Sequence, residues 1–224
     1  MGPPREPRLR PKQFPGNFAN SLANEFSSRN YCRVSEDPAR IADLIERLGR
    51  LADALQRSGG LVPAQWEALR YLGRANRYSR HPGALAAFLG TTKGTVSQTI
   101  IALERKGLVV RTDDPRDRRA VHIDLTDAGR GALSQDPLGG LAEVAAGLQE
   151  AAAARLAADL TALLARLQRR RGRPGFGVCG TCRFFRRKGA EDEAAGPHRC
   201  GLTQEPLGDT DARHICVEHT PLVA

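Results

Sequence analysis

The sequence predicts a mainly α-helical fold with a small two-stranded β-ribbon, and three observations lead to this α+β class. Apolar side chains recur at helical spacing over several segments of the chain. Residues 121–125 alternate apolar and polar side chains, as a half-buried strand does. Turn-forming residues at Gly107 and Pro115 separate a helical pattern from a strand pattern and one strand from the next.

Length and composition set the limits of the fold and of its partners. The chain has 224 residues, 41% of them hydrophobic, which is enough for one sizeable core and an appendage. A net charge of +9 favours a polyanion as partner, with nucleic acid first and an anionic membrane surface second. We expect a cytoplasmic protein, because the sequence has neither an apolar run of membrane-spanning length nor the apolar core of a signal peptide.

Composition divides the chain into three parts. Residues 1–35 are rich in Pro, Arg, Asn and Ser, which predicts a flexible basic arm. Residues 36–172 carry the helical periodicity and the ribbon. Residues 173–224 follow an arginine-rich linker and hold four of the five cysteines. The fifth, Cys32, lies alone at the end of the arm, where an inert small residue is the usual outcome.

Apolar spacing predicts six helical segments in the middle part of the chain. They are residues 37–56, a helix that begins at Pro63, and residues 79–90, 92–106, 126–133 and 141–171, and Thr126 is expected to cap the fifth of them. Trp66 is expected in the core. Gly139 and Gly140, after an Asp-Pro pair, are expected to interrupt the helical path before the last segment. That segment has a leucine stripe too long to bury on one small domain, which predicts a second subunit, with an intramolecular helical hairpin as the alternative.

The segment over residues 92–106 has one packing side and one free side. Val96, Ile100 and Leu103 fall at i, i+4 and i+7 and form an apolar stripe, and Thr91 or Thr92 is expected to cap the helix. The free side begins with a lysine in a turn that more often prefers acidic residues, which suits an anionic partner. The candidate contacts on this side are Lys93, Thr95, Ser97 and Gln98.

A basic ribbon follows this helix. Gly107 is expected to end the helix, and residues 108–110 and 121–125 are expected to pair as antiparallel strands. The turn between them, TDDPRDRR, carries Arg116, Arg118 and Arg119. A helix fits the major groove of double-stranded DNA, and an arginine-bearing ribbon can reach phosphates or the minor groove, so the two elements predict a clamp on a duplex.

These elements together resemble the winged helix-turn-helix of MarR-type transcriptional regulators. The matching pieces are LVPAQWEALRYL at residues 61–72, LAAFLGTTKGTVSQTIIALERKGLVVR at 85–111 and DPRDRRAVHIDLTDAGR at 114–130. The resemblance implies a homodimer formed by the first and last helices, which would read a pseudo-palindromic operator in successive major grooves. It also implies that Arg118 and Arg119 contact DNA, and that a small-molecule effector could bind beside the dimer helices.

The C-terminal part carries the pattern Cys179-x2-Cys182-x17-Cys200-x15-Cys216. In a reducing compartment such a set predicts metal ligands or redox groups. Too little apolar material remains in this part for an unaided core, which favours an inorganic centre. A zinc ribbon normally brings two close pairs of ligands, whereas a cubic iron-sulfur cluster accepts one pair and two single cysteines.

The spacing resembles that of high-potential iron-sulfur proteins and of small cluster-bearing subunits of some glycyl-radical enzymes. This resemblance implies a [4Fe-4S] cluster. Zn²⁺ remains the alternative, because Cys216-x2-His219 would provide a second knuckle and His198 could replace Cys200 as a ligand.

The sequence therefore predicts a DNA-binding regulator whose cluster senses redox state, oxygen, nitric oxide or iron. Changes in the tail would reach the dimer interface through the preceding helix. A MarR-type repressor with a small-molecule effector and a structural zinc module is one alternative, and an electron-transfer partner protein is another. We expect no enzymatic activity, because the sequence has no nucleophile with a neighbouring base, no phosphate-binding glycine loop and no HExxH helix.

Overall fold

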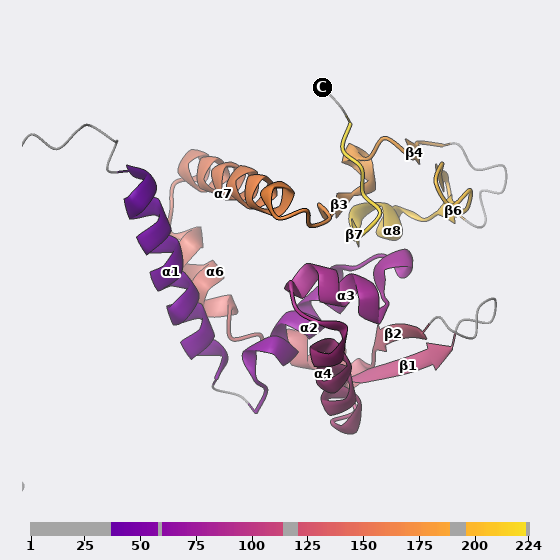
Figure 1. Ribbon diagram of the computed structural model, residues 1–224, viewed down its shortest axis with the longest axis horizontal. Coiled ribbons are helices and arrows are strands. Elements are labelled where there is room, and N and C mark those ends of the chain that lie inside the picture. Colours follow the sequence, from indigo (N-terminus) through magenta and orange to yellow (C-terminus); the bar gives the residue numbers. More distant parts are fainter. Residues whose placement is uncertain (1–36, 58–59, 114–120, 189–195, 223–224) are drawn as a thin grey trace, which may run out of the picture. The chain divides into compact units, whose positions relative to one another are not determined.

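The computed structural model of the chain describes residues 37–57, 60–113, 121–188 and 196–222 (Figure 1). The chain divides into two units, residues 1–46 and residues 47–224. In the first unit the structure describes the start of helix α1 (Asp37–Gln56). The predicted arm, Cys32 and the three arginines of the ribbon turn, Arg116, Arg118 and Arg119, lie outside the described residues.

The second unit continues from α1 into a helical region with one antiparallel ribbon. Its elements are α2 (Pro63–Arg74), the 3-10 turn η1 (Arg77–Ser79), α3 (Pro82–Leu89), α4 (Lys93–Arg105), β1 (Val109–Asp113), β2 (Val121–Leu125), α5 (Asp127–Leu133), α6 (Gly139–Ala146) and α7 (Glu150–Arg170). The C-terminal elements are β3 (Gly177–Val178), η2 (Cys179–Thr181), β4 (Phe185–Arg186), β5 (His198–Cys200), β6 (Pro206–Leu207), α8 (Asp209–Arg213) and β7 (Ile215–Cys216). The predicted class, mainly helical with small antiparallel strands, is confirmed.

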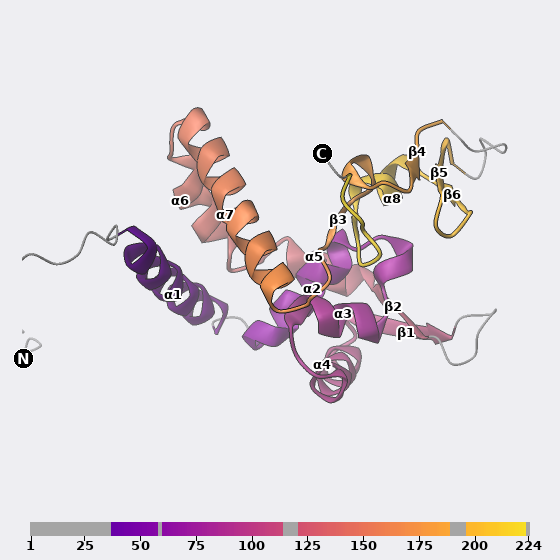
Figure 2. The same cartoon turned by 45° about the horizontal axis from the view of Figure 1, so that its top comes forward.

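The core lies where α2, α3 and α4 pack on one another and on the ribbon of β1 and β2 (Figure 2). Leu69, Leu85 and Leu103, one from each helix, are fully buried, and Ile123 of β2 closes the core. Trp66 is buried as predicted. Burial of these apolar side chains supplies the main stabilisation of this region, and it fixes which side of α4 remains free.

Local capping signals operate as the sequence predicts. The hydroxyl of Thr92 accepts the backbone N–H of Thr95 at 3.1 Å and starts α4. Thr126 caps α5 in the same way, with an N–H···O distance of 3.0 Å from Gly129. Gly107 ends α4 with a φ of +69°, a left-handed conformation that suits glycine. The following strand β1 extends to Asp113, beyond the predicted end at Val110, because every residue of β1 pairs with one of β2.

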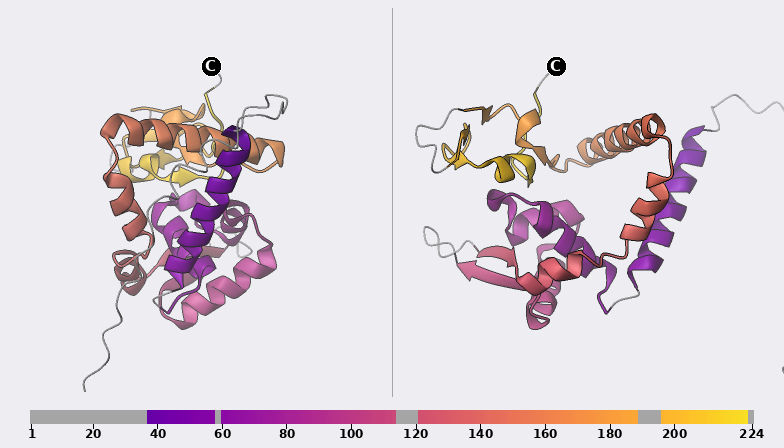
Figure 3. Two further views of the ribbon diagram at one scale, coloured as in Figure 1. Left: turned by 90° about the vertical axis from the view of Figure 1, so that its left-hand side faces the viewer. Right: turned by 180° about the vertical axis from the view of Figure 1, so that it is seen from behind.

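Two helical segments differ from the prediction. Residues 141–171 form two helices, and the break falls at Gln149, whose ψ of 141° turns the chain between α6 and α7 (Figure 3). Gly139 and Gly140 do not interrupt the path; they form the first turn of α6. The helix predicted from Ser79 begins at Pro82, whose fixed φ and missing N–H suit a first turn, and Ser79 lies in η1.

The apolar faces of α6 and α7 are exposed in the single chain. Val144 is 75% exposed, and Leu156 and Leu164 are 49% and 56% exposed. Faces of this kind usually pack against another surface. In the described part of the chain, no helix is long and apolar enough to cross a membrane.

Two adjacent valines of β1 test the assignment of its faces. Val109→Ala is expected to lower the free energy of unfolding by about 2 kcal/mol, because two buried methyl groups are lost. Val110 is 42% exposed, so Val110→Ala is expected to change it by less than about 0.5 kcal/mol. Chemical denaturation followed by circular dichroism compares the two, and equal losses would contradict the assignment.

Candidate nucleic-acid interface and cysteine cavity

Four of the seven predicted DNA contacts lie on the exposed side of α4. Lys93, Thr95, Ser97 and Gln98 are all exposed, whereas the stripe of Val96, Ile100 and Leu103 is buried. The hydroxyl of Thr95 lies 3.0 Å from that of Thr92, so it also takes part in the cap.

An ion pair connects α4 with the ribbon. Arg111 of β1 approaches Glu104 of α4 at 2.7 Å, and its Nε donates to the same carboxylate at 3.2 Å. Arg111 thereby neutralises Glu104, the one acidic residue of α4. Lys93 remains an exposed cation at the start of the helix. An exposed cation beside exposed hydroxyl and amide side chains is a surface that can meet both phosphates and base edges.

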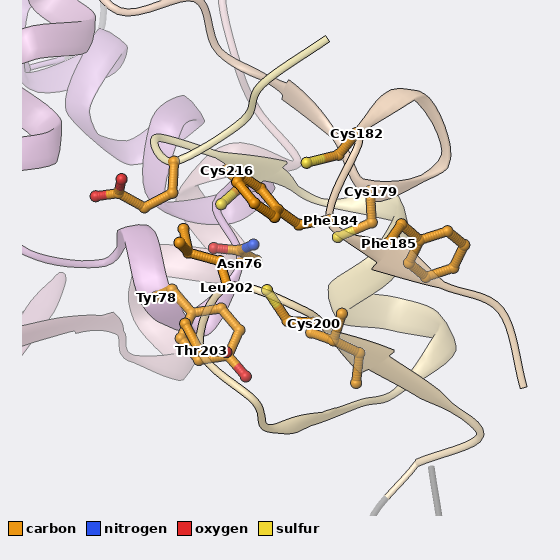
Figure 4. A pocket seen from close by; sticks show the side chains of 12 residues that line it. Asn76, Tyr78, Cys179, Cys182, Phe184, Phe185, Cys200, Leu202, Thr203 and Cys216 are labelled. Atoms are coloured by element: carbon orange, nitrogen blue, oxygen red, sulfur yellow. The ribbon is translucent and has the colours of Figure 1, made fainter. Parts of the chain in front are cut away.

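The four C-terminal cysteines line one cavity (Figure 4). The cavity itself has a volume of about 20 Å³. All four cysteines are free thiols. The other lining residues are mainly apolar or aromatic: Phe184, Phe185, Leu202, Leu207, Asn76, Tyr78, Thr203 and Glu218. Free thiols in a cavity with an apolar lining can ligate a soft metal centre that is shielded from water.

Short backbone contacts bring the cysteines to this cavity. The N–H of Cys182 donates to the carbonyl of Cys179 at 2.9 Å and closes the turn of the Cys-x2-Cys pair. Cys200 pairs with Phe185 in the sheet of β4 and β5, and Cys216 pairs with Gly177 where β7 meets β3. The two single cysteines, Cys216 and Cys200, are therefore held by β3 and β4, the strands that precede and follow the Cys179–Cys182 pair in sequence.

The thiol of Cys179 is electrostatically coupled to the other three. Burial raises its pKa to about 11, with further contributions from Cys216, Cys182 and Cys200. Without a cation among them, this thiol stays protonated at neutral pH. A bound metal ion would favour the thiolate, since coordination removes the proton from a thiol.

The two histidines considered as alternative ligands do not line the cavity. His198 is buried, its Nε2 lies 3.0 Å from a carboxylate oxygen of Asp209, and its Nδ1 accepts the N–H of Lys188 at 3.2 Å. Nε2 of His219 lies 3.0 Å from the hydroxyl of Thr181. Both histidines thus have partners within the C-terminal part itself.

One wall of the cavity comes from the helical region, which sequence reasoning missed. Asn76 and Tyr78, at the corner between α2 and α3, line the cavity beside the cysteines. No periodicity or motif distinguishes this corner, because RANRYSR reads as an ordinary polar connection. Only its packing against residues more than a hundred positions later gives it a role.

Hydrogen bonds and an arginine join the corner to the C-terminal part. The backbone N–H of Asn76 donates to the carbonyl of Ile215, and the N–H of Val217 donates to the hydroxyl of Ser79, both at 2.9 Å. Arg77 lies 3.7 Å from Asp211 and 3.6 Å from Glu205, and it donates to the carbonyl of Pro206.

Aromatic packing reinforces this junction. The ring of Phe176 meets the rings of Phe88 and Tyr71 edge to face, with centroid distances of 5.1 and 6.1 Å. Phe176, Ile215 and Val217 also pack against the buried core of the helical region. The cysteine-bearing part therefore shares its apolar contacts with the helices, and this compensates for its lack of a core of its own.

Residues 59–120 match the model of the MarR family, a span that includes α2, α3, α4 and β1. The uncharacterized HTH-type transcriptional regulator YkoM of Bacillus subtilis (strain 168) is 35% identical over 79 residues, which cover 34% of this chain. The match spans about half of that relative, 48% of its length.

Two solved structures are similar in fold. The transcriptional regulator BldR from Sulfolobus solfataricus has a TM-score of 0.50 and 22% identity, over 60% of this chain and 99% of that one. MepR of S. aureus in its DNA-binding conformation has a TM-score of 0.50 and 24% identity, over 59% of this chain and 98% of that one. These likenesses show the fold of this part of the chain, and the family match is limited to residues 59–120.

The arginine at the junction provides a test of the docking. Arg77→Ala is expected to weaken the docking by about 1 kcal/mol, a modest value because the ion pairs are partly exposed. Local opening would then be roughly fivefold more frequent, and the four thiols of the reduced, metal-free protein would react correspondingly faster with a thiol reagent. Arg130→Ala removes an exposed pair with Asp127 on α5 and serves as the control. An unchanged labelling rate in Arg77→Ala would contradict the role of this arginine.

Proposed function

We propose that this protein is a MarR-type, DNA-binding transcriptional regulator whose affinity for DNA is tuned by an iron-sulfur cluster, [4Fe-4S], held by Cys179, Cys182, Cys200 and Cys216. One observation carries the proposal: the four cysteines and two residues of the winged helix line the same cavity. A change at the cysteines therefore alters the surroundings of the DNA-reading domain directly.

The DNA-binding half of the proposal rests on the free side of α4, the net charge of +9 and the family match over residues 59–120. Lys93 is assigned to phosphates, and Gln98 can pair bidentately with adenine. Thr95 and Ser97 can reach base edges or phosphates. Arg116, Arg118 and Arg119 of the wing are assigned to phosphate and minor-groove contacts.

The partner of the exposed apolar faces on α6 and α7 is assigned as a second copy of the chain. Leu156 and Leu164 belong to a stripe that the single chain leaves uncovered. A two-fold dimer would bury such faces and set the distance between two reading helices, which then meet a pseudo-palindromic site in successive major grooves.

The donor set of the cavity fits an iron-sulfur cluster. Each thiolate of a cubic cluster binds a separate iron, so the ligands stand apart from one another. A mononuclear zinc site instead needs four ligands about 2.3 Å or less from one ion. Among the residues that the structure describes, no group of three or more His, Cys, Asp or Glu side chains is placed to hold a metal ion, so metal analysis decides between the two centres. Phe184 and Phe185 line the cavity and would shield a cluster from solvent.

When bound, a cluster supplies a redox couple and a centre that reacts to oxygen, nitric oxide or iron supply. The cluster can change DNA binding only if the chain has two conformations that differ both in affinity for the cluster and in affinity for DNA. The contacts of Asn76 and Ser79 with the segment around Cys216 provide a path for this coupling within one subunit.

Salt-dependent DNA binding tests the reading face. Lys93→Ala is expected to weaken binding to all sequences and to reduce the slope of log K against log salt by about 1, because one phosphate contact is lost. Gln98→Ala is expected to cost roughly 1–3 kcal/mol at one base pair of the site.

Fluorescence anisotropy over a salt series, with duplexes that the protein itself selects from a random pool, measures both effects. Arg155→Ala, on α7 outside the winged helix, is the control and should leave the slope unchanged. Binding that does not depend on salt would overturn the assignment of DNA as the partner.

Metal content tests the cysteine cavity. Protein purified without oxygen is expected to be brown, with a broad absorption in the visible range and with iron and sulfide in the sample. Cys182→Ala should lose this absorption, and Cys32→Ala, outside the cavity set, should keep it. A colourless protein that contains zinc would overturn the cluster and make the C-terminal part a structural zinc module, with a small-molecule effector as the signal.

A further inference from the structure

We propose that the side-chain amide of Asn76 donates a hydrogen bond to a sulfur atom of the centre held by the four cysteines. This inference rests on the proposed iron-sulfur centre and names the residue through which the winged helix would detect it. Asn76 precedes η1 on the DNA-binding side of the junction, and no sequence pattern marks it.

The orientation of the amide follows from its hydrogen bonds. Asn76 is 1% exposed. The hydroxyl of Ser79 accepts the N–H of Val217 at 2.9 Å, so its own proton is available for the side-chain oxygen of Asn76, 2.8 Å away. The oxygen end of the amide therefore faces Ser79, and the nitrogen end points away from it.

That nitrogen has no hydrogen-bond partner within the described part of the chain. Figure 4 shows it turned toward the space between the cysteine sulfurs. A buried N–H without an acceptor destabilises a protein, so such a group in a native fold calls for a partner. Tyr78, Thr203 and Glu218 also line the cavity, but none of their side chains bonds to this nitrogen, and the cysteines bring sulfur to this space as an acceptor.

The other buried side-chain nitrogens without a partner do not share this placement. In the described residues these are Nε1 of Trp66 and Nδ1 of His214, and neither residue lines the cysteine cavity. Asn76 thus combines burial, a defined amide orientation and a place in the wall of the cavity. Trp66 provides a matched control, since its Nε1 also has no hydrogen-bond partner in the described residues and it does not line the cavity.

A hydrogen bond from Asn76 would have two consequences. Donors to the sulfurs of a cluster stabilise its more negative, reduced state and so raise its reduction potential. The same bond connects the centre to the corner, where Nε of Arg80 donates to the carbonyl of Ala75 and its guanidinium pairs with Asp124 of the ribbon at 2.9 Å. Loss of the centre would leave the Asn76 amide unpaired and change the stability of the corner that supports α3.

The test compares anaerobically purified full-length wild type with three variants. Asn76→Asp keeps the shape and the acceptor for Ser79 but removes the donor; Asn76→Leu removes the donor without adding charge; Trp66→Phe is the control. Both Asn76 variants should show a more negative reduction potential in spectroelectrochemistry and should lose iron to a chelator roughly 10- to 100-fold faster. Trp66→Phe should match wild type in both measurements.

A second measurement needs no variant of Asn76. Wild-type protein labelled with ¹⁵N at the asparagine side chain should show a ¹⁵N coupling to the paramagnetic cluster in pulsed electron paramagnetic resonance. The chain has five asparagines, so the same coupling after replacement of Asn17, Asn20, Asn24 and Asn30 by Gln identifies Asn76 as its source. If the Asn76 variants fail to fold, this experiment decides alone.

The outcomes separate the two proposals. Wild type without iron and sulfide would overturn the proposed function, and this inference with it. Wild type with a cluster, no ¹⁵N coupling, and an unchanged potential and iron loss in the Asn76 variants would overturn the inference alone and leave the proposed function intact.

Discussion

The hydrogen bonds at the corner between α2 and α3 are the constraint on which both halves of the second unit depend. Ser79 is the centre of this arrangement. Its hydroxyl accepts the N–H of Val217 and donates to the side-chain oxygen of Asn76, and its carbonyl accepts the hydroxyl of Tyr71 at 2.7 Å. Burial raises the pKa of Tyr71 and keeps it a neutral donor. Because Tyr71, Asn76 and Ser79 are buried, losing one of these partners leaves another polar group unsatisfied, so the corner is expected to open as a unit.

The two halves are stabilised by different physics. The winged helix buries leucine, isoleucine and valine from three helices and a ribbon, which is an ordinary apolar core. The C-terminal part has strands two or three residues long, the 3-10 turn η2 and the short helix α8, and its apolar side chains Phe176, Ile215 and Val217 pack against that core. A metal centre would add stability by binding the folded arrangement alone, so its assembly and the docking of this part would be thermodynamically linked.

This arrangement changes where a signal would travel. The sequence pointed to the last helix before the tail as the path to a dimer interface. The structure offers a shorter connection, since Arg77, Asn76 and Tyr78 of the winged helix contact the cysteine-bearing part directly. Two arginines of this corner form ion pairs in opposite directions: Arg77 pairs with Asp211 of the C-terminal part, and Arg80 pairs with Asp124 of the ribbon. Coupling through a continuous set of contacts requires two arrangements of this corner with different DNA affinities.

The sequence by itself determined most of the helices, a threonine cap for α4, the cap of α5 at Thr126, the ribbon and the free side of α4, because periodicity and capping are local properties of the chain. It also predicted which cysteines belong together, from their spacing. It missed the break at Gln149, because Leu148, Gln149 and Glu150 are good helix formers and the apolar stripe continues across it. Only the tertiary structure decided that Asn76 and Tyr78 form a wall of the cysteine cavity. They lie more than a hundred residues from Cys179 in sequence, and a contact over that distance depends on packing that no local pattern encodes.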